Sequence, residues 1–430
     1  MIITKSVKKL NNNNTTFRSA NYEDNKKYYD NTIDEKEIII YDYLHYRPNS
    51  LNPYQETITY NTDRIEAYDG TEQRIPLLIQ PRNKFSYYYT LDNKNLRDFN
   101  SFLFKNQSKV IKIPVWSEIT FINKPIDSID TIIFVKDINY RRFNVNTEFV
   151  LVNHLDYSDY QFINIEGIDK ENNLVWNSST IGRDWPAGTI MMPVVKVFFK
   201  DNINKVMTTD RLSNFELEMT ILADDSNIIS ESTFIYDKYK DMYVLSRQPD
   251  KSTDITQLWQ RKIMMYDLGY GKQDWIDKQD KPFILYDYKF KFFNKKEIGD
   301  FKTFINKLGG SLKEFWMPTF EYDLKVIPNL TIAGNVIMIE NNNNYLYNLK
   351  RNYIMIKLKN GTELFSKVNI EQVDLTRERL ILDDFTFTIN SNEIDYISFL
   401  NKVRFNSDEF VFSYYNDEMC EISKTVYIQY

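Results

Sequence analysis

The chain contains one stretch of sequence twice, and this internal repeat constrains its fold more than any single residue does. Residues 82–116 read RNKFSYYYTLDNKNLRDFNSFLFKNQSKVIKIPVW, and residues 286–320 read YDYKFKFFNKKEIGDFKTFINKLGGSLKEFWMPTF. Each stretch predicts a strand, then an amphipathic helix, then a loop that brings an aromatic residue next to a proline. Such a repeat indicates two tandem copies of one structural unit.

The two predicted helices align residue by residue. Their apolar positions are Leu96, Phe99, Phe102 and Leu103, which correspond to Ile298, Phe301, Phe304 and Ile305 at a constant separation of 202 (298 − 96). The i, i+3, i+6 and i+7 spacing forms one apolar face, and Asp92 is expected to cap the first helix. Pro114 and Pro318 are 204 apart (318 − 114), so a two-residue insertion at Gly309-Gly310 is expected.

The rest of the chain predicts a mainly β (β-rich α+β) fold. Short runs of branched and aromatic residues recur at spacings of about 8–12 residues, which is typical of all-β domains. We expect two tandem β-sandwich-like units, each with one packed helix, and small β-barrel-like inserted or appended regions. The expected division is residues 1–60 for an N-terminal arm and the first strands, 61–223 for the first repeat unit with a β insertion, 224–257 for a connector, and 258–430 for the second repeat unit with a β insertion.

Individual strands are expected outside the repeated stretch as well. They include residues 37–43, 57–60, 74–79, 190–199, 215–222, 242–245, 330–332, 336–339, 353–359, 380–382 and 385–389, with a hairpin over 160–176. Residues 403–405 and 410–430 correspond loosely to residues 207–222. This correspondence would extend the duplication to the end of each half.

Composition bounds the possible partners and cellular context. The 430 residues carry a net charge of −6, so no basic field recruits nucleic acid. Aromatic residues make up 15% of the chain, which is ample material for packed cores. Cys420 is the only cysteine, which excludes a disulfide within the chain. The N-terminal MIITKSVKKLNNNN has no apolar signal-peptide core, and no run approaches the roughly 18 apolar residues of a membrane span. We therefore expect a protein made in a reducing cytoplasm, without membrane insertion.

The residues that commonly carry catalysis are sparse or scattered. The only histidines, His45 and His154, lie in different segments, and neither has a partner at metal-ligand spacing. No GxSxG, GxxxxGK[ST], GxGxxG or EF-hand pattern occurs, and residues 267–271 (DLGYG) are interpreted as a turn. The carboxylate pairs Asp224-Asp225 and Asp383-Asp384 leave glycoside hydrolysis as the least excluded reaction. We predict no catalytic, cofactor-binding or metal-binding residues, and no enzymatic activity.

Two aromatic runs, residues 87–89 and 412–415, admit two interpretations. They are able to form stacking platforms for sugars or bases. Alternation along a strand also turns every second ring inward, so core and subunit interface explain them as well. We favour the core and interface, and because the run 87–89 does not recur ring by ring, any function of one copy should lie outside the repeated core.

The motifs around the repeat resemble a pattern found in tailed-bacteriophage tail proteins. Residues 72–116 carry EQR, a Pro-Arg pair before an aromatic strand, a helix of the type L–F–FL and a loop ending in P-x-W, and residues 185–193 (WPAGTIMMP) and 280–320 also resemble this family. The second copy has no clear equivalent of EQR or Pro-Arg before Asp287. The resemblance implies a structural protein of the virion tail, in a ring of the tail tip or baseplate that joins the tail tube to the hub and receptor-binding parts.

This resemblance leaves several alternatives open. Three chains of two units each would match a sixfold ring, whereas six chains would form a double-layered collar. The implied partners are further copies of this chain, as a trimer or hexamer, and other virion tail proteins. A carbohydrate- or receptor-binding module of a tail is the second hypothesis, and a glycan-cleaving tail enzyme is the third.

Overall fold

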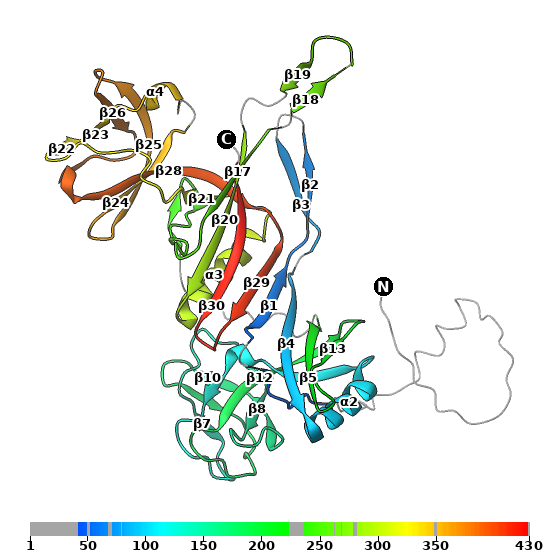
Figure 1. Ribbon diagram of the computed structural model, residues 1–430. Helices are drawn as coiled ribbons and strands as arrows, with labels where there is room; N and C mark the ends of the chain where they lie inside the picture. Colours follow the sequence, from blue (N-terminus) through cyan, green and yellow to red (C-terminus); the bar gives the residue numbers. More distant parts are fainter. Residues whose placement is uncertain are drawn as a thin grey trace, which may run out of the picture. The chain divides into compact units, whose positions relative to one another are not determined.

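The strand, helix and strand expected from the repeat are present in both halves of the chain (Figure 1). The computed structural model describes residues 42–49, 52–67, 71–78, 80–222, 236–261, 263–267, 269–277, 282–347 and 351–428, all within one compact unit, Asp42–Tyr430. The fold is mainly β, as the sequence predicts, and its largest sheet is antiparallel throughout its named strand pairs. The expected strand at residues 37–43 and the pair Asp224-Asp225 lie outside the described residues, apart from residues 42 and 43.

The first unit consists of a long hairpin, a helix and a group of sheet strands. Its elements are β1 (Tyr54–Thr59), β2 (Thr62–Glu66), β3 (Glu72–Pro76), β4 (Arg82–Asp92), α2 (Asn93–Asn106), β5 (Val110–Pro114), β12 (Ile190–Phe199), β13 (Asn204–Met207) and β14 (Leu212–Ile221). Because β1 pairs with β4, this unit extends further toward the N-terminus than the expected start at residue 61.

The second unit repeats these elements in the same order. They are β17 (Thr256–Gln260), β18 (Ile263–Tyr266), β19 (Asp274–Asp277), β20 (Phe283–Phe292), α3 (Lys295–Leu308), β21 (Phe315–Pro318), β28 (Ile394–Phe405), β29 (Glu409–Tyr414) and β30 (Cys420–Ile428). The strand pairs also repeat: β4–β14, β5–β12, β12–β14 and β13–β14 become β20–β30, β21–β28, β28–β30 and β29–β30. The duplication therefore covers whole units, including residues 207–222 and 403–428.

Strand register identifies a counterpart of the EQR segment that the sequence comparison missed. Thr62 pairs with Pro76 across the β2–β3 hairpin, and Ile263 pairs with Asp277 across β18–β19, so both partners are displaced by 201 residues (263 − 62 and 277 − 76). The counterpart of residues 72–74 is therefore residues 273–275, Gln-Asp-Trp. The hairpin recurs as backbone although its side-chain chemistry has changed.

The two inward-facing rings of residues 87–89 recur, whereas the outward-facing Tyr88 corresponds to Lys289, so the run does not recur ring by ring, as expected. Tyr89 contacts Phe99 at a centroid distance of 5.4 Å, and Phe290, 201 residues later, contacts Phe301 at 5.7 Å. Tyr87 corresponds in the same way to the buried Tyr288. Alternation of the strand turns these rings into the core.

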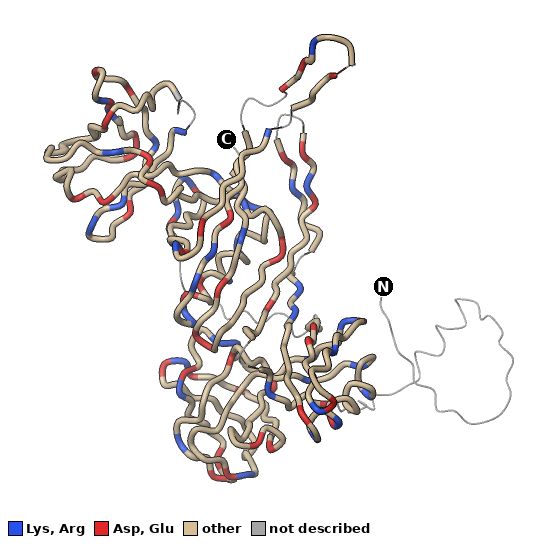
Figure 2. The backbone as a smooth tube through the Cα atoms, in the orientation of Figure 1, with Lys and Arg blue, Asp and Glu red and all other residues tan. Residues whose placement is uncertain are grey.

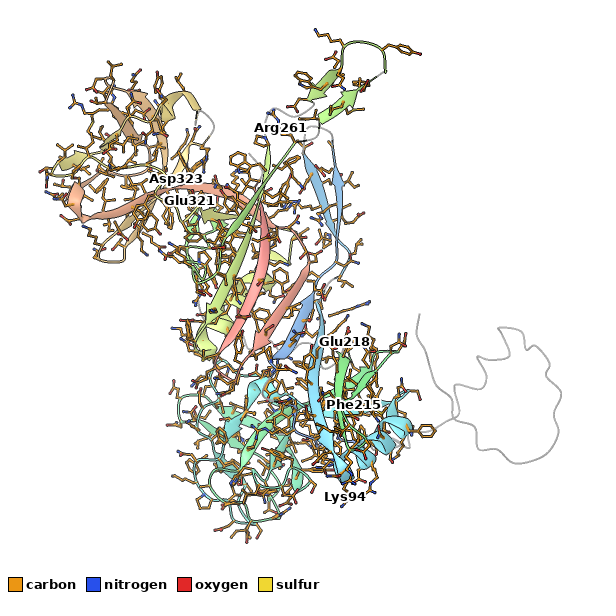
Figure 3. All side chains as sticks on the ribbon, in the orientation of Figure 1. Lys94, Phe215, Glu218, Arg261, Glu321 and Asp323 are labelled. Atoms are coloured by element: carbon orange, nitrogen blue, oxygen red, sulfur yellow. The ribbon has the colours of Figure 1, made fainter. Side chains whose placement is uncertain are left out.

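Each helix packs its apolar face on the sheet of its own unit. Leu96, Phe99 and Leu103 of α2 are buried, and Phe99 stacks edge-on against Phe215 of β14 at 4.8 Å (Figure 3). In α3 the four corresponding apolar side chains, Ile298, Phe301, Phe304 and Ile305, are all fully buried. Burial of each such side chain contributes about 1.5–3 kcal/mol to stability, so the repeated face is a major source of folding free energy.

The helix ends differ between the copies. Asp92 occupies the position before α2 as expected, but its side chain makes no capping hydrogen bond; its carboxylate accepts from the Asn93 side chain at 3.4 Å. Asn294 does cap α3, since its side chain accepts from the backbone N–H of Glu297 at 2.8 Å. Gly309 and its neighbour then end α3 with left-handed φ angles of 68° and 72°. The two-residue insertion expected there accounts for the longer loop before β21.

An insertion lies at the same place in each unit, between the strand after the helix and the next core strand. The first contains η1 (Trp116–Glu118), β6 (Thr120–Phe121), β7 (Ile132–Phe134), β8 (Thr147–Val152), β9 (Tyr160–Ile165), β10 (Gly167–Asp169) and β11 (Leu174–Trp176). The second contains β22 (Thr331–Gly334), β23 (Val336–Glu340), α4 (Asn344–Tyr347), β24 (Tyr353–Leu358), β25 (Glu363–Gln372), β26 (Arg377–Leu382), β27 (Phe387–Asn390) and η3 (Ser391–Glu393). Each insertion has a hydrophobic core of its own.

Between the units, a short hairpin of β15 (Lys238–Tyr239) and β16 (Met242–Tyr243) packs onto the second unit. Leu245 donates its backbone N–H to the carbonyl of Trp316, and Trp316 donates its indole N–H to the carbonyl of Tyr239 at 2.9 Å. The described part of the connector is therefore attached to the second unit.

Candidate functional site

The first strand of the first unit joins the two units into one sheet. One edge of β1 pairs with β4 of its own unit, and the other edge pairs with β29 of the second unit over six residue pairs. Gln55 lies opposite Ser413 in this second pairing. Backbone hydrogen bonds across this junction make the two units one continuous sheet, and the junction is therefore described as the candidate functional site.

A buried cluster of charges lies directly behind this strand pair. Glu56 of β1 has no exposed surface, and its carboxylate accepts hydrogen bonds from Lys302 of α3 at 2.6 Å and from the Tyr414 hydroxyl of β29 at 3.1 Å. It also forms an ion pair with Arg142 of the first insertion. One carboxylate thus ties together the first unit, its insertion and the second unit.

The charge of Glu56 is maintained by its partners. Burial by itself would raise the pKa of this carboxyl, but the adjacent charges of Arg142 and Lys302 outweigh burial and lower the pKa to about 2. A buried carboxylate that stays ionised across the physiological range stabilises the junction only while both cations remain in place.

A second buried pair extends the cluster. Lys295, in the first turn of α3, lies 3.2 Å from the carboxylate of Glu118 and also donates to the carbonyl of Ser117. Burial lowers the pKa of Lys295, and the carboxylate of Glu118 counteracts that effect. The second unit's helix is therefore fastened to the first unit by two lysines, near its start and its middle.

The EQR segment contributes a third set of contacts across the junction. Glu72 of β3 accepts from Arg404 of β28 at 2.7 Å, and Arg74 lies 2.5 Å from Glu314, just before β21. Figure 2 shows that charged residues of both signs occur along the β2–β3 hairpin. Residues 72–74 thus form an ionic clamp between the two units.

The loop after α3 completes the junction by close packing. The carboxylate of Asp408 accepts backbone hydrogen bonds from Thr62 at 2.6 Å and from Ser311 at 2.8 Å, one from each unit. A Cβ on Gly310 would lie 2.7–2.9 Å from Asp408 and Tyr60, and its φ of 72° is left-handed. Glycine is therefore required here both for backbone conformation and for space.

Most of the residues weighed from sequence lie outside this junction. His45 is partly buried and stacks on Tyr46 at 4.3 Å, and burial lowers its pKa, whereas His154 is exposed. Cys420 does lie at the junction, opposite Tyr414, and burial raises the pKa of its thiol to about 12. Asp384 accepts a hydrogen bond from the hydroxyl of Tyr239, so it serves to hold the connector. None of these groups is brought together with another of them.

Both aromatic runs reach the junction, the first through Tyr87 beside Glu56 and Arg142. Phe412 and Tyr414 are buried behind β1, while Tyr415 remains 52% exposed. The charged cluster itself was not anticipated, since Glu56 and Lys302 are 246 residues apart and become neighbours only through β1–β29 pairing. The duplication was the sequence feature most relevant to this cluster, because the cluster lies where the two repeated units meet.

A further pair of acids lies beside the second insertion. Glu321 and Asp323 follow β21 (Figure 3), and burial raises the pKa of both carboxyls. Asp323 accepts from the hydroxyl of Thr319 and from the backbone N–H of Phe399 at 2.8 Å. These bonds attach the segment to β28, so Asp323 has a structural role.

Within the described residues, no set of three or more His, Cys, Asp or Glu side chains is arranged to hold a metal ion. Nor does any described helix have the length and apolar character that crossing a membrane requires. No protein-family model matches the chain, and the comparison with curated proteins finds no match.

Proposed function

We propose that this protein is a structural component of a bacteriophage tail tip, where it forms a ring that connects the tail tube to the hub and receptor-binding parts. The proposal combines the resemblance of residues 72–116 to tail proteins with the whole-unit duplication. It assigns no enzymatic activity, because the buried charges and acid pairs described above are engaged in holding elements together.

The observation that carries this proposal is the way in which the two units are joined. β1 of the first unit meets β29 of the second, so the two units contribute different surfaces to the same junction. Such a heterologous junction, repeated from unit to unit, generates a ring when the rotation closes. A chain with two equivalent units in one sheet favours a single ring of three chains and six units over a double-layered collar.

Locating the chain on virions tests the proposed function. Affinity-purified antibodies against the protein, applied to intact particles, are expected to label the tip of the tail in negative-stain images. Labelling of capsids, or of no particle, while the same antibodies recognise the purified protein, would overturn the proposal. Antibodies depleted on the purified protein provide the control for nonspecific labelling.

A further inference from the structure

The junction inside the chain has two counterparts that remain open. Register makes β17 the counterpart of β1, and β13 the counterpart of β29 (Figure 1). Among the described strands, β17 pairs only with β20, and β13 pairs only with β14. One chain thus forms the β1–β29 contact once. It also carries one further counterpart of each strand, β17 and β13, and these two do not pair with each other.

The open strands differ sharply from their counterparts in burial. Ile58 of β1 and Phe412 of β29 are at most 1% exposed, whereas every residue of β13 and β17 is exposed. The exposed apolar side chains are Leu258 at 52% and Trp259 at 59% on β17, and Val206 at 63% and Met207 at 72% on β13. Unpaired apolar edges on both units fit burial against another chain.

The charged residues of the ionic clamp have uncharged counterparts on both open surfaces. Glu72 and Arg74 of the first hairpin correspond to Gln273 and Trp275 of the second, 201 residues later. Trp275 is 66% exposed. The charged groups of the first hairpin therefore give way to an amide and an indole.

The partners of Glu72 and Arg74 inside the chain, Arg404 and Glu314, also have uncharged counterparts. Val197 and Val403 pair with Ile221 and Ile428, so Arg404 corresponds to Phe198, 206 residues earlier (403 − 197). The 204-residue separation of Pro114 and Pro318 makes Val110 the counterpart of Glu314. Phe198 is 43% exposed and lies beside Val110 across β12–β5. Two ion pairs inside the chain thus correspond to uncharged contacts on the open surfaces, an indole against Val110 and an amide against Phe198.

Two members of the buried cluster have uncharged counterparts as well. Glu56 corresponds to Gln257, and Lys302 corresponds to Asn100 of α2. A cleft of about 660 Å³ also runs beside β13, lined by Asn204, Lys205, Val206, Phe215 and residues of β4. The open surfaces therefore have the geometry of the existing junction without its buried ions, whose desolvation opposes association of separate molecules.

We propose that β17 and the β18–β19 hairpin of one chain dock onto β13, β12 and β5 of a second copy, in the register of the β1–β29 pair. Gln55 lies opposite Ser413 inside the chain, and these correspond to Thr256 (256 − 55 = 201) and Val206 (413 − 206 = 207). Thr256 then lies opposite Val206 of the next copy, and Trp275 covers Val110 and Phe198. This contact rests on the proposed ring, for which it names the partner and the surface.

Cysteine pairing in the full-length protein tests the register. Opposed residues of antiparallel strands have Cα atoms about 4.5–5.5 Å apart, within the range for a disulfide. Mixing a Thr256→Cys chain with a Val206→Cys chain under mild oxidation is expected to give crosslinked dimers, because each chain carries one half of the pair. The matched control, Gln257→Cys with Val206→Cys, directs the thiols to opposite faces and should crosslink at least ten times less. The native Cys420 is buried and contributes little background.

The apolar clamp is tested separately by Trp275→Glu, with Trp176→Glu as the control. Both tryptophans are exposed, at 66% and 43%, so neither change should prevent folding. Trp275→Glu is expected to weaken self-association at least tenfold by analytical ultracentrifugation, whereas Trp176→Glu on the first insertion leaves it unchanged.

The outcomes separate this contact from the proposed function. A ring without crosslinks at Thr256 and Val206, or one that tolerates Trp275→Glu, overturns the contact while the tail function stands. In-register crosslinks in a protein that antibodies never find on tails establish the contact and overturn the function. A chain that stays monomeric and does not crosslink overturns the contact.

Discussion

Replacing Glu56 by glutamine tests the role of the buried cluster, because the substitution keeps the shape of the side chain and removes its charge. The partners Arg142 and Lys302 are 3% and 6% exposed, so they would remain buried without a counterion. Lowering the Glu56 pKa from 4.5 to about 2 corresponds to about 3 kcal/mol at 1.36 kcal/mol per pH unit. Breaking a buried ion pair typically costs about 3–5 kcal/mol, which agrees with the stabilisation that corresponds to the lowered pKa.

The assay is denaturant unfolding monitored by tryptophan fluorescence, with Glu340→Gln as the control. Glu340 pairs with Lys325 at 2.8 Å, but these side chains are 42% and 69% exposed, so the expected loss there is below about 1 kcal/mol. A Glu56→Gln loss below about 0.5 kcal/mol would refute the reasoning.

The effect of Glu56→Gln on stability should also depend on pH. Because the folded pKa of Glu56 lies below its ordinary value, its contribution is fully present above pH 4.5 and is lost as pH falls toward 2. The stability difference between the native protein and Glu56→Gln should therefore shrink as pH falls through this window. A difference that stays constant between pH 6 and pH 3 would contradict the assignment of an ionised Glu56.

Three further predictions concern other parts of the fold. Gly310→Ala should destabilise the fold by about 1–3 kcal/mol in thermal unfolding, because its Cβ would meet Tyr60 at less than 3 Å. The control Gly334→Ala changes a glycine that is also left-handed but lies in open space, so it should cost less. Phe301→Ala should cost about 3–5 kcal/mol from a fully buried site, and Phe104→Ala, 95% exposed, less than about 0.5 kcal/mol by denaturant unfolding. Self-association should persist between 0.05 and 0.5 M NaCl in sedimentation experiments, because its contacts are apolar; a tenfold loss would point to an ionic contact instead.

The duplication could be predicted because helix periodicity repeats faithfully. Ile298 and Phe301 are buried at the positions that Leu96 and Phe99 predict. The second hairpin could not be predicted as a counterpart of the first, because backbone pairing survived while Arg74 became Trp275. Sequence comparison depends on side-chain identity, and the side chains of the two hairpins differ.

Strand extent was harder to predict than strand existence. β28 runs over Ile394–Phe405, of which only residues 403–405 were expected, and β25, over Glu363–Gln372, was missed. β25 mixes lysine and glutamate with its apolar residues, and its ladder with β24 and β26 compensates for weak local preference.

The candidate site lay beyond sequence reasoning for a different reason. Glu56, Arg142 and Lys302 come from three parts of the chain, and no local spacing connects them. Lys302 reaches Glu56 through the pairing of β1 with β29, which forms between the two copies of the repeat, and Arg142 reaches it from the first insertion.

Electron microscopy of the purified full-length protein tests the central claim most directly, since that claim is the head-to-tail repetition of one junction. Class averages are expected to contain closed rings with six similar lobes, and mass photometry of the same sample should give three times the mass of one chain. Particles that stay monomeric at micromolar concentration, or that stack as two layers with the units of one chain in different layers, would contradict the claim.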